Sequence, residues 1–164
     1  MIRRGAVLFL ALAGLAGPAL ADCTDGAAPK VKWHRCLQDN RTLTGVDLGE
    51  AVLREATFLR SDLSGSSLRG ADAYRAKFVS GKLTGTVFDG ARLIEADFSR
   101  ADLTGASFKD ADLRSARFYE ADLRKANFSG ARLERADLRN ADLAGATWTD
   151  GKRVCVEPSV GQCN

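Results

Sequence analysis

The feature that most constrains this fold is a five-residue repeat that runs without insertion from Arg41 to Asp150. Every fifth residue is bulky and apolar, with Ala73 as the single small exception. A second register lies two residues earlier and is alanine without interruption from Ala91 through Ala146. The apolar register consists of Leu43, Leu48, Leu53, Phe58, Leu63, Leu68, Ala73, Phe78, Leu83, Phe88, Leu93, Phe98, Leu103, Phe108, Leu113, Phe118, Leu123, Phe128, Leu133, Leu138, Leu143 and Trp148.

A period of five fits neither common secondary-structure element. Residues five apart on an α-helix lie about 140° from one another, so they would be spread around the helix, and a half-buried strand needs a period of two. A short exact repeat instead predicts a solenoid. If each pentapeptide makes one side, the central Leu or Phe and the preceding small residue point inward, while the other three positions face water.

The tandem A-[D/N/S/R]-[L/F]-x-x units resemble the pentapeptide-repeat family over about two thirds of the chain. The resemblance implies an all-β fold, a right-handed quadrilateral β-helix with one pentapeptide per side and four per coil. We expect about 5.5–6 coils at a spacing of roughly 4.7–4.9 Å, which gives a rod roughly 25 Å long.

Sorting the apolar register by four supports this quadrilateral independently, because phenylalanine falls only on two opposite sides. We number the sides by their central residues: side 1 (43, 63, 83, 103, 123, 143), side 2 (48, 68, 88, 108, 128, 148), side 3 (53, 73, 93, 113, 133) and side 4 (58, 78, 98, 118, 138). Glycine ends units only on sides 1 and 2. We therefore expect positive φ at the corners after those sides, and at the other two corners a turn that tolerates side chains.

The N-terminus has the pattern of a secretory signal peptide. Arginines at positions 3 and 4 precede the apolar run Ala6–Gly17, and Ala19–Ala21 supplies small residues for cleavage after Ala21. A retained anchor is the alternative, although the run is short for a membrane span. We expect a mature chain without a membrane segment, periplasmic or extracellular, divided into a signal peptide (1–21), an N-terminal disulfide cap (22–40), a solenoid (41–150) and a C-terminal disulfide cap (151–164). Carrying the five-residue frame backwards suggests that the solenoid itself starts near Val31.

Four cysteines flank the repeat, two at each end. An even number at the ends of a secreted chain predicts disulfides, with three possible pairings. Because the two ends of the rod cannot approach each other, we expect Cys23 to pair with Cys36 and Cys155 with Cys163. Metal binding by Cys23, His34 and Cys36 is the alternative, but three ligands do not make a structural zinc pattern, so no metal or cofactor is expected.

Outward positions one coil apart alternate in charge on sides 3 and 4, which favours a ladder of solvated ion pairs. On side 1 the alternation fails, and Asp102, Asp122 and Asp142 are expected to stack as an acidic stripe. Such a stripe could attract a cation or a basic partner, or serve only the repeat. Thr44, Ser64, Thr84 and Thr104 on the same side also resemble the threonine columns of ice-binding β-solenoids, but a single column flanked by aspartates does not favour that function.

An apolar patch is the candidate protein or dimer interface, because contiguous exposed apolar surface marks partner sites. It consists of Leu59, Tyr74, Val79 and Ile94 at outward positions of neighbouring coils, with Tyr119 further along.

Catalysis finds little support in this sequence. The single histidine, His34, precedes the repeat, and no phosphate-binding loop or metal motif occurs. Residues 41–150 carry 17 basic and 17 acidic residues, and loss of the signal peptide takes the formal charge from +3 to +1. Nucleic-acid binding is therefore not expected.

We accordingly expect a non-enzymatic, secreted interaction module with an unidentified protein partner and a possible homodimer. The alternatives are an inert structural or stress-protective rod and a DNA mimic that binds a topoisomerase, an activity known in the family. The balanced charge and the signal peptide disfavour the DNA mimic.

Overall fold

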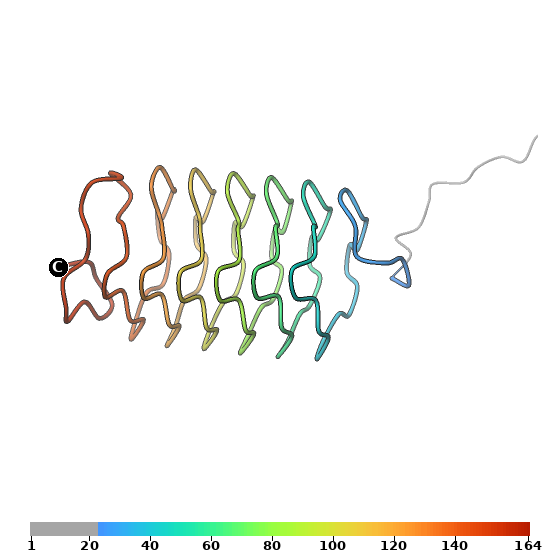
Figure 1. The fold of residues 1–164 in the computed structure, drawn as a ribbon, viewed down its shortest axis with the longest axis horizontal. Helices are drawn as coiled ribbons and strands as arrows, with labels where there is room; N and C mark the ends of the chain where they lie inside the picture. Colours follow the sequence, from blue (N-terminus) through green and yellow to red (C-terminus); the bar gives the residue numbers. More distant parts are fainter. Residues whose placement is uncertain (1–22) are drawn as a thin grey trace, which may run out of the picture.

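The computed structural model describes residues 23–164, so the predicted signal peptide lies outside the described residues. The chain winds as a rod of stacked coils, with its C-terminus at one end (Figure 1). Residues 23–164 contain no helix and no continuous strand: from residue 31 to residue 150 each side contributes one bridging residue followed by a turn. Among these residues there is accordingly no helix that could cross a membrane.

The coils are held in register by parallel backbone pairing. Every parallel bridge joins residues 20 apart, from Lys32 with Val52 to Asn127 with Thr147, so one coil holds four pentapeptides. The amide at the centre of each side donates to the next coil, as Leu103 N does to Asp122 O at 2.8 Å. Residues 31–40 already run in this register.

The same left-handed backbone conformation forms all four corners of the coil. Gly65 on side 1 has φ 66°, while Arg75 on side 3 and Arg100 on side 4 have φ 56° and 57°. Our expectation of a different turn on sides 3 and 4 is therefore wrong. A non-glycine residue in this conformation costs roughly 1–2 kcal/mol, and the hydrogen bonds of neighbouring coils hold it there.

The core is a thin column of inward side chains. Phenyl rings on the same side stack from coil to coil with centroids 5.0–5.2 Å apart and planes 4–6° apart. Rings on sides 2 and 4 meet edge to face across the column at 5.6–6.2 Å. These contacts add to the burial of the rings, so aromatic packing links sides as well as coils.

Both ends of the column carry a local disulfide, as the sequence predicts. Cys23 pairs with Cys36 across a Cα–Cα distance of 5.4 Å, and Cys155 pairs with Cys163 across 4.9 Å. Trp33 is fully buried in the first coil. The buried Gln38, a polar residue in the apolar register, donates its amide to Cys23 O at 3.2 Å.

We predict that Phe98→Ala will destabilise the protein by about 3–5 kcal/mol, because the ring is fully buried and touches four other phenyl rings. The matched variant Phe98→Leu, which places on side 4 the residue found at position 138, should cost only roughly 1 kcal/mol. Denaturant unfolding measures both values. Equal losses for the two variants would contradict the stacked core.

Candidate functional site

The alternating charges on sides 3 and 4 form ion pairs between coils. Arg92 lies 2.9 Å from Asp72 on side 3, and Arg117 lies 3.6 Å from Asp97 on side 4. Asp112 is approached from two directions: Arg132 lies 3.7 Å away in the next coil, and Arg114 in the same coil donates at 2.7 Å. All of these pairs are partly exposed, so each contributes only a few tenths of a kcal/mol. They fix side-chain positions more than they stabilise the fold.

Tyr74 is the centre of an arginine cluster on side 3. The guanidinium carbons of Arg75 and Arg92 lie 4.9 Å from the ring centroid, and that of Arg54 lies 5.6 Å away. Arg92 is also paired with Asp72, and Arg75 donates to Glu95 at 2.7 Å. Opposite charges and the aromatic face therefore hold several arginine side chains in place at one spot.

The predicted apolar patch is largely covered. Leu59, Tyr74, Val79 and Ile94 occupy the expected outward positions but are half-buried, and only Tyr119 is exposed, at 37%. Arg139 lies over the Tyr119 ring, 5.8 Å from its centroid. These residues flank a charged surface and do not form an open apolar one.

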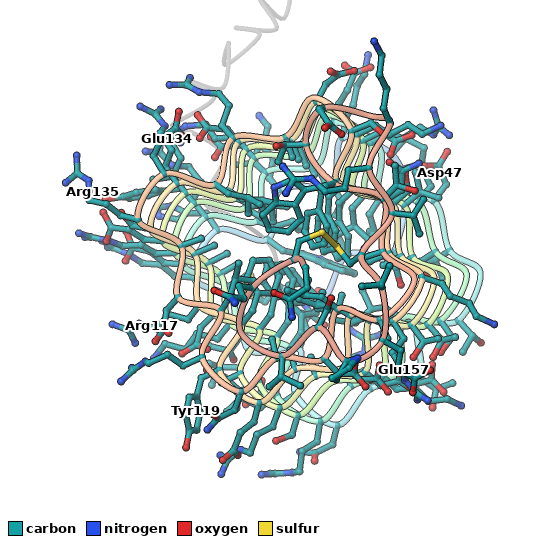
Figure 2. All side chains as sticks on the ribbon, turned by 90° about the vertical axis from the view of Figure 1, so that its left-hand side faces the viewer. Asp47, Arg117, Tyr119, Glu134, Arg135 and Glu157 are labelled. Atoms are coloured by element: carbon teal, nitrogen blue, oxygen red, sulfur yellow. A yellow bond between two sulfur atoms is a disulfide. The ribbon has the colours of Figure 1, made fainter. Side chains whose placement is uncertain are left out.

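The corner between sides 3 and 4 carries an open groove of about 470 Å³, which we call the corner groove. Its lining consists of Arg75, Lys77, Glu95, Asp97, Ser115 and Arg117. The groove is open at Ser115 because its side chain is short. The equivalent corner positions of the neighbouring coils carry the long side chains of Glu95 and Arg135. A smaller groove of about 270 Å³, lined partly by Ile94 and Glu134, adjoins the same serine. In the end view of Figure 2, the side chains of Arg117, Glu134 and Arg135, which lie on sides 3 and 4, project outward from the rod.

The corner groove was not predicted from the sequence, although the sequence contains one sign of it. Ser115 breaks a column of long charged residues, and Lys77 makes no ion pair within residues 23–164. The gap at Ser115 could have been found from the repeat frame, whereas the unpaired state of Lys77 could not, because the frame places Lys77 beside Asp97.

The acidic stripe on side 1 is stacked as predicted, with Asp102 bridged to Asp122 and Asp122 to Asp142. Its charge is only partly compensated, because Arg124 pairs with Asp122 and lies 3.9 Å from Asp142, whereas Asp102 has no ion pair within residues 23–164. The Arg124 guanidinium lowers the pKa of the Asp122 carboxyl. Within residues 23–164 no group of three His, Cys, Asp or Glu side chains is placed to hold a metal ion.

The described part of the chain has no free thiol and one imidazole. All four cysteines are in disulfides, and His34 is exposed on the first coil. The apolar side chains with the largest exposed fractions lie near the two ends of the rod: Leu37 at 75%, Val154 at 54%, Val156 at 62% and Val160 at 57%. None of these four residues was among the predicted interface residues, although Val154 and Val156 directly flank Cys155 in the sequence.

Comparison with known proteins agrees with the repeat. A family model described as a pentapeptide repeat region matches residues 71–148, and one described as pentapeptide repeats (8 copies) matches residues 42–79. No curated protein matches this chain.

Two solved structures illustrate the similarity. HetL, a pentapeptide repeat protein involved in heterocyst differentiation regulation from the cyanobacterium Nostoc sp. strain PCC 7120, is 31% identical; the match covers 74% of this chain and 67% of HetL, with a TM-score of 0.41. Trypsin-treated QnrB1, a plasmid-mediated fluoroquinolone resistance protein, is 17% identical over 84% of this chain and 85% of QnrB1, with a TM-score of 0.41.

We predict an acid-sensitive contribution to stability from Asp137. Hydrogen bonds from the Arg139 guanidinium lower the pKa of this carboxyl from 3.8 to about 2. Because the folded pKa is the lower one, the contribution is complete above about pH 4 and is lost as the pH falls through about 2. Arg139→Gln should therefore lower the melting temperature at neutral pH and flatten its fall below about pH 4.

Melting temperature followed by circular dichroism against pH measures this effect. Arg100→Gln is the matched control, because Arg100 makes no ion pair within residues 23–164 and its removal should leave the wild-type pH profile. If Arg139→Gln keeps that profile as well, the Asp137 ion pair has no role in acid stability.

Proposed function

This chain belongs to the pentapeptide-repeat family, and we propose that it acts as a non-enzymatic protein-interaction module. The rod in this proposal is the right-handed quadrilateral β-helix of about 5.5–6 coils that the resemblance to this family implies. A solenoid of this kind presents long, regular surface columns, which suit an extended contact with a partner.

The corner groove is the observation that carries the proposal. It combines unpaired Lys77 with Arg75 and Arg117, and it lies next to the arginine cluster around Tyr74. Tyrosine and arginine are enriched among residues that contribute most to protein–protein binding. Side chains already ordered by ion pairs and ring contacts lose less conformational freedom when a partner binds. We therefore place the partner contact on the corner between sides 3 and 4.

We further propose that the protein works in the periplasm or outside the cell. The supporting features are the signal-peptide pattern of residues 1–21 and the two disulfides, which form and persist in oxidising compartments. A role as a DNA mimic would require a strongly acidic rod, whereas the repeat carries equal numbers of acidic and basic residues.

Charge reversal in the corner groove should abolish partner capture. We expect the oxidised mature chain to retain a periplasmic protein from extract, and the Lys77→Glu, Arg117→Glu double variant to retain at least about tenfold less, a loss of roughly 1.4 kcal/mol or more. The control, Lys82→Glu with Lys109→Glu on sides 1 and 2, changes the net charge equally and should keep the partner.

Circular dichroism of both variants verifies that the fold is intact. Equal capture by the two variants would place the contact on another face. Capture of nothing by the wild-type chain would favour the alternative of an inert rod.

Export can be tested separately. We expect the full-length chain, expressed in a bacterium with a periplasm, to appear in the periplasmic fraction with Asp22 as its first residue. Replacement of Arg3 and Arg4 by Glu should retain it in the cytoplasm, because the positive n-region would be lost. N-terminal sequencing of fractionated protein gives the answer, and uncleaved wild-type protein in the membrane fraction would support the retained anchor.

A further inference from the structure

The equal numbers of acidic and basic residues in the solenoid conceal an uneven distribution around it. We call sides 3 and 4 the basic half and sides 1 and 2 the acidic half. The basic half consists of residues 31–40, 51–60, 71–80, 91–100, 111–120 and 131–140. It carries 13 Lys and Arg against 9 Asp and Glu, whereas the other residues from 41 to 150 carry 6 against 9. One half therefore has a net charge of +4 and the other a net charge of −3.

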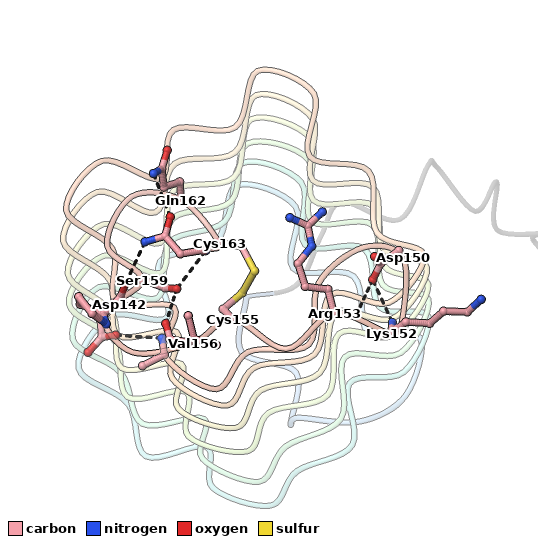
Figure 3. Close-up of a disulfide and its surroundings, with 12 residues drawn as sticks. Asp142, Asp150, Lys152, Arg153, Cys155, Val156, Ser159, Gln162 and Cys163 are labelled. Carbon is pink, nitrogen blue, oxygen red and sulfur yellow. Dashed lines mark hydrogen bonds between the residues drawn. A yellow bond between two sulfur atoms is a disulfide. The ribbon is translucent and has the colours of Figure 1, made fainter.

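The two ends of the chain do not change this division. Residues 23–30 add no net charge, and residues 151–164 add +1. The C-terminal cap folds across the last coil next to its disulfide, where the Asp150 carboxylate accepts hydrogen bonds from the backbone amides of Lys152 and Arg153 at 2.9 and 2.8 Å (Figure 3). The cap supplies no residue to either groove at the corner between sides 3 and 4. The charge difference therefore belongs to the long sides of the rod.

In the corner groove, Lys77 is the positive charge that has no partner. Glu95 is paired with Arg75 at 2.7 Å. Asp97 lies 3.6 Å from Arg117. Lys77 is exposed and makes no ion pair within residues 23–164, although it is bridged to Asp97 through the backbone. Because both carboxylates of the groove are already compensated, a further carboxylate placed there would meet an unpaired ammonium group.

In the smaller groove that adjoins Ser115, Arg135 is left without a partner in the same way. Glu134 lies 3.9 Å from Arg132. Arg114 pairs with an aspartate of its own coil at 2.7 Å. Arg135 is exposed, makes no ion pair in the described part of the chain and projects from the rod in Figure 2. Each of the two grooves therefore offers one unpaired cation.

The two unpaired cations are spaced to bind one extended peptide. Lys77 and Arg135 belong to the two grooves that meet at Ser115, and they lie three coils apart, which is roughly 14 Å along the rod. An extended peptide covers this distance in about four residues, at about 3.3 Å each. Residues four apart in a strand point to the same side. Two carboxylates at that spacing would therefore both face the rod.

The carboxylates between these cations argue against a continuous polyanion as the ligand. The basic half still carries 9 acidic residues, and its excess of +4 is spread along the whole rod. Duplex DNA carries one negative charge per about 1.7 Å, so a length of roughly 25 Å brings about 15 charges. Such a ligand, or an anionic membrane, would meet the acidic residues as well as the basic ones. A peptide with a few spaced carboxylates avoids this repulsion.

We infer that the partner presents an extended acidic segment of about five residues to the corner between sides 3 and 4, with one carboxylate at Lys77 and another, four residues away, at Arg135. This inference rests on the proposed function, which supplies a protein partner, and it names the chemistry of the contact. The acidic half repels the same segment. The net charges of the two halves therefore determine which face of the rod turns toward the partner.

Fluorescence anisotropy of a labelled deca-glutamate peptide tests the inference. We expect the oxidised mature chain to bind this peptide, with an affinity that falls as salt is added. Lys77→Gln with Arg135→Gln removes the two unpaired cations and should weaken binding about tenfold. The matched control, Lys109→Gln with Lys125→Gln, removes two exposed cations of the acidic half that make no ion pair within residues 23–164, and it should bind like the wild type. All four side chains are exposed, so both variants should fold.

Cross-linking of the wild-type chain gives a second measurement that needs no variant. A carbodiimide joins a bound glutamate carboxyl group to a lysine amine, and mass spectrometry identifies the lysine. We expect Lys77 to be the main site, with little modification of Lys109 and Lys125. Equal modification of the three lysines would overturn the inference.

Three results of the anisotropy experiment would also overturn it: no binding of deca-glutamate, equal losses in the two double variants, or equally tight binding of duplex DNA or anionic vesicles. The last result would make the basic half a general polyanion surface. Failure of the proposed function is distinguishable from these results. A partner captured from extract without peptide binding would keep the interaction module and remove its acidic segment. Peptide binding without any captured partner would do the reverse.

Discussion

The structure depends on one constraint, the pairing of each coil's backbone with the coils before and after it. The ladder consists of isolated bridges spaced 20 residues apart, and no side is long enough to be stable by itself. Each side is stable only because the neighbouring coils supply its hydrogen bonds and close the column of leucine and phenylalanine side chains. The need to pair with neighbouring coils also overrides the local backbone preferences of individual residues. Arg75 and Arg100 adopt left-handed conformations because the coil must turn there.

The same constraint organises the surface. Outward side chains of residues 20 apart lie next to each other, so a charge on one coil always faces the equivalent position of the next. Opposite charges on sides 3 and 4 form ion pairs, and the aspartates of side 1 depend on Arg124 for compensation. Small departures from the repeat then have local consequences. Ser115 opens a groove in a column of long side chains, and Tyr74 is contacted by the guanidinium groups of three arginines.

The first and last coils each lack one neighbouring coil to pair with, and the two ends of the rod are closed in different ways. At the start, Cys23, Trp33 and Gln38 close the column with a disulfide, a buried ring and an amide hydrogen bond. At the other end the chain reverses and pairs antiparallel with two of the four sides. A reversed cap of this length covers only half of the end. The open half is therefore a consequence of ending a four-sided coil with a two-sided cap.

The sequence by itself determined the inward residues, the four-unit coil and the local disulfides, because a five-residue period has few other ways to bury its apolar register. It could not determine which outward residues are accessible. Leu59, Val79 and Ile94 occupy the predicted outward positions but are half-buried. The turn at the non-glycine corners and the uncapped backbone groups of sides 3 and 4 were likewise decided by the tertiary structure. Which side chains are buried in the core follows from the five-residue period of the sequence. How exposed an outward side chain is depends on the residues 20 positions before and after it, and which backbone groups are unpaired depends on where the last coil ends.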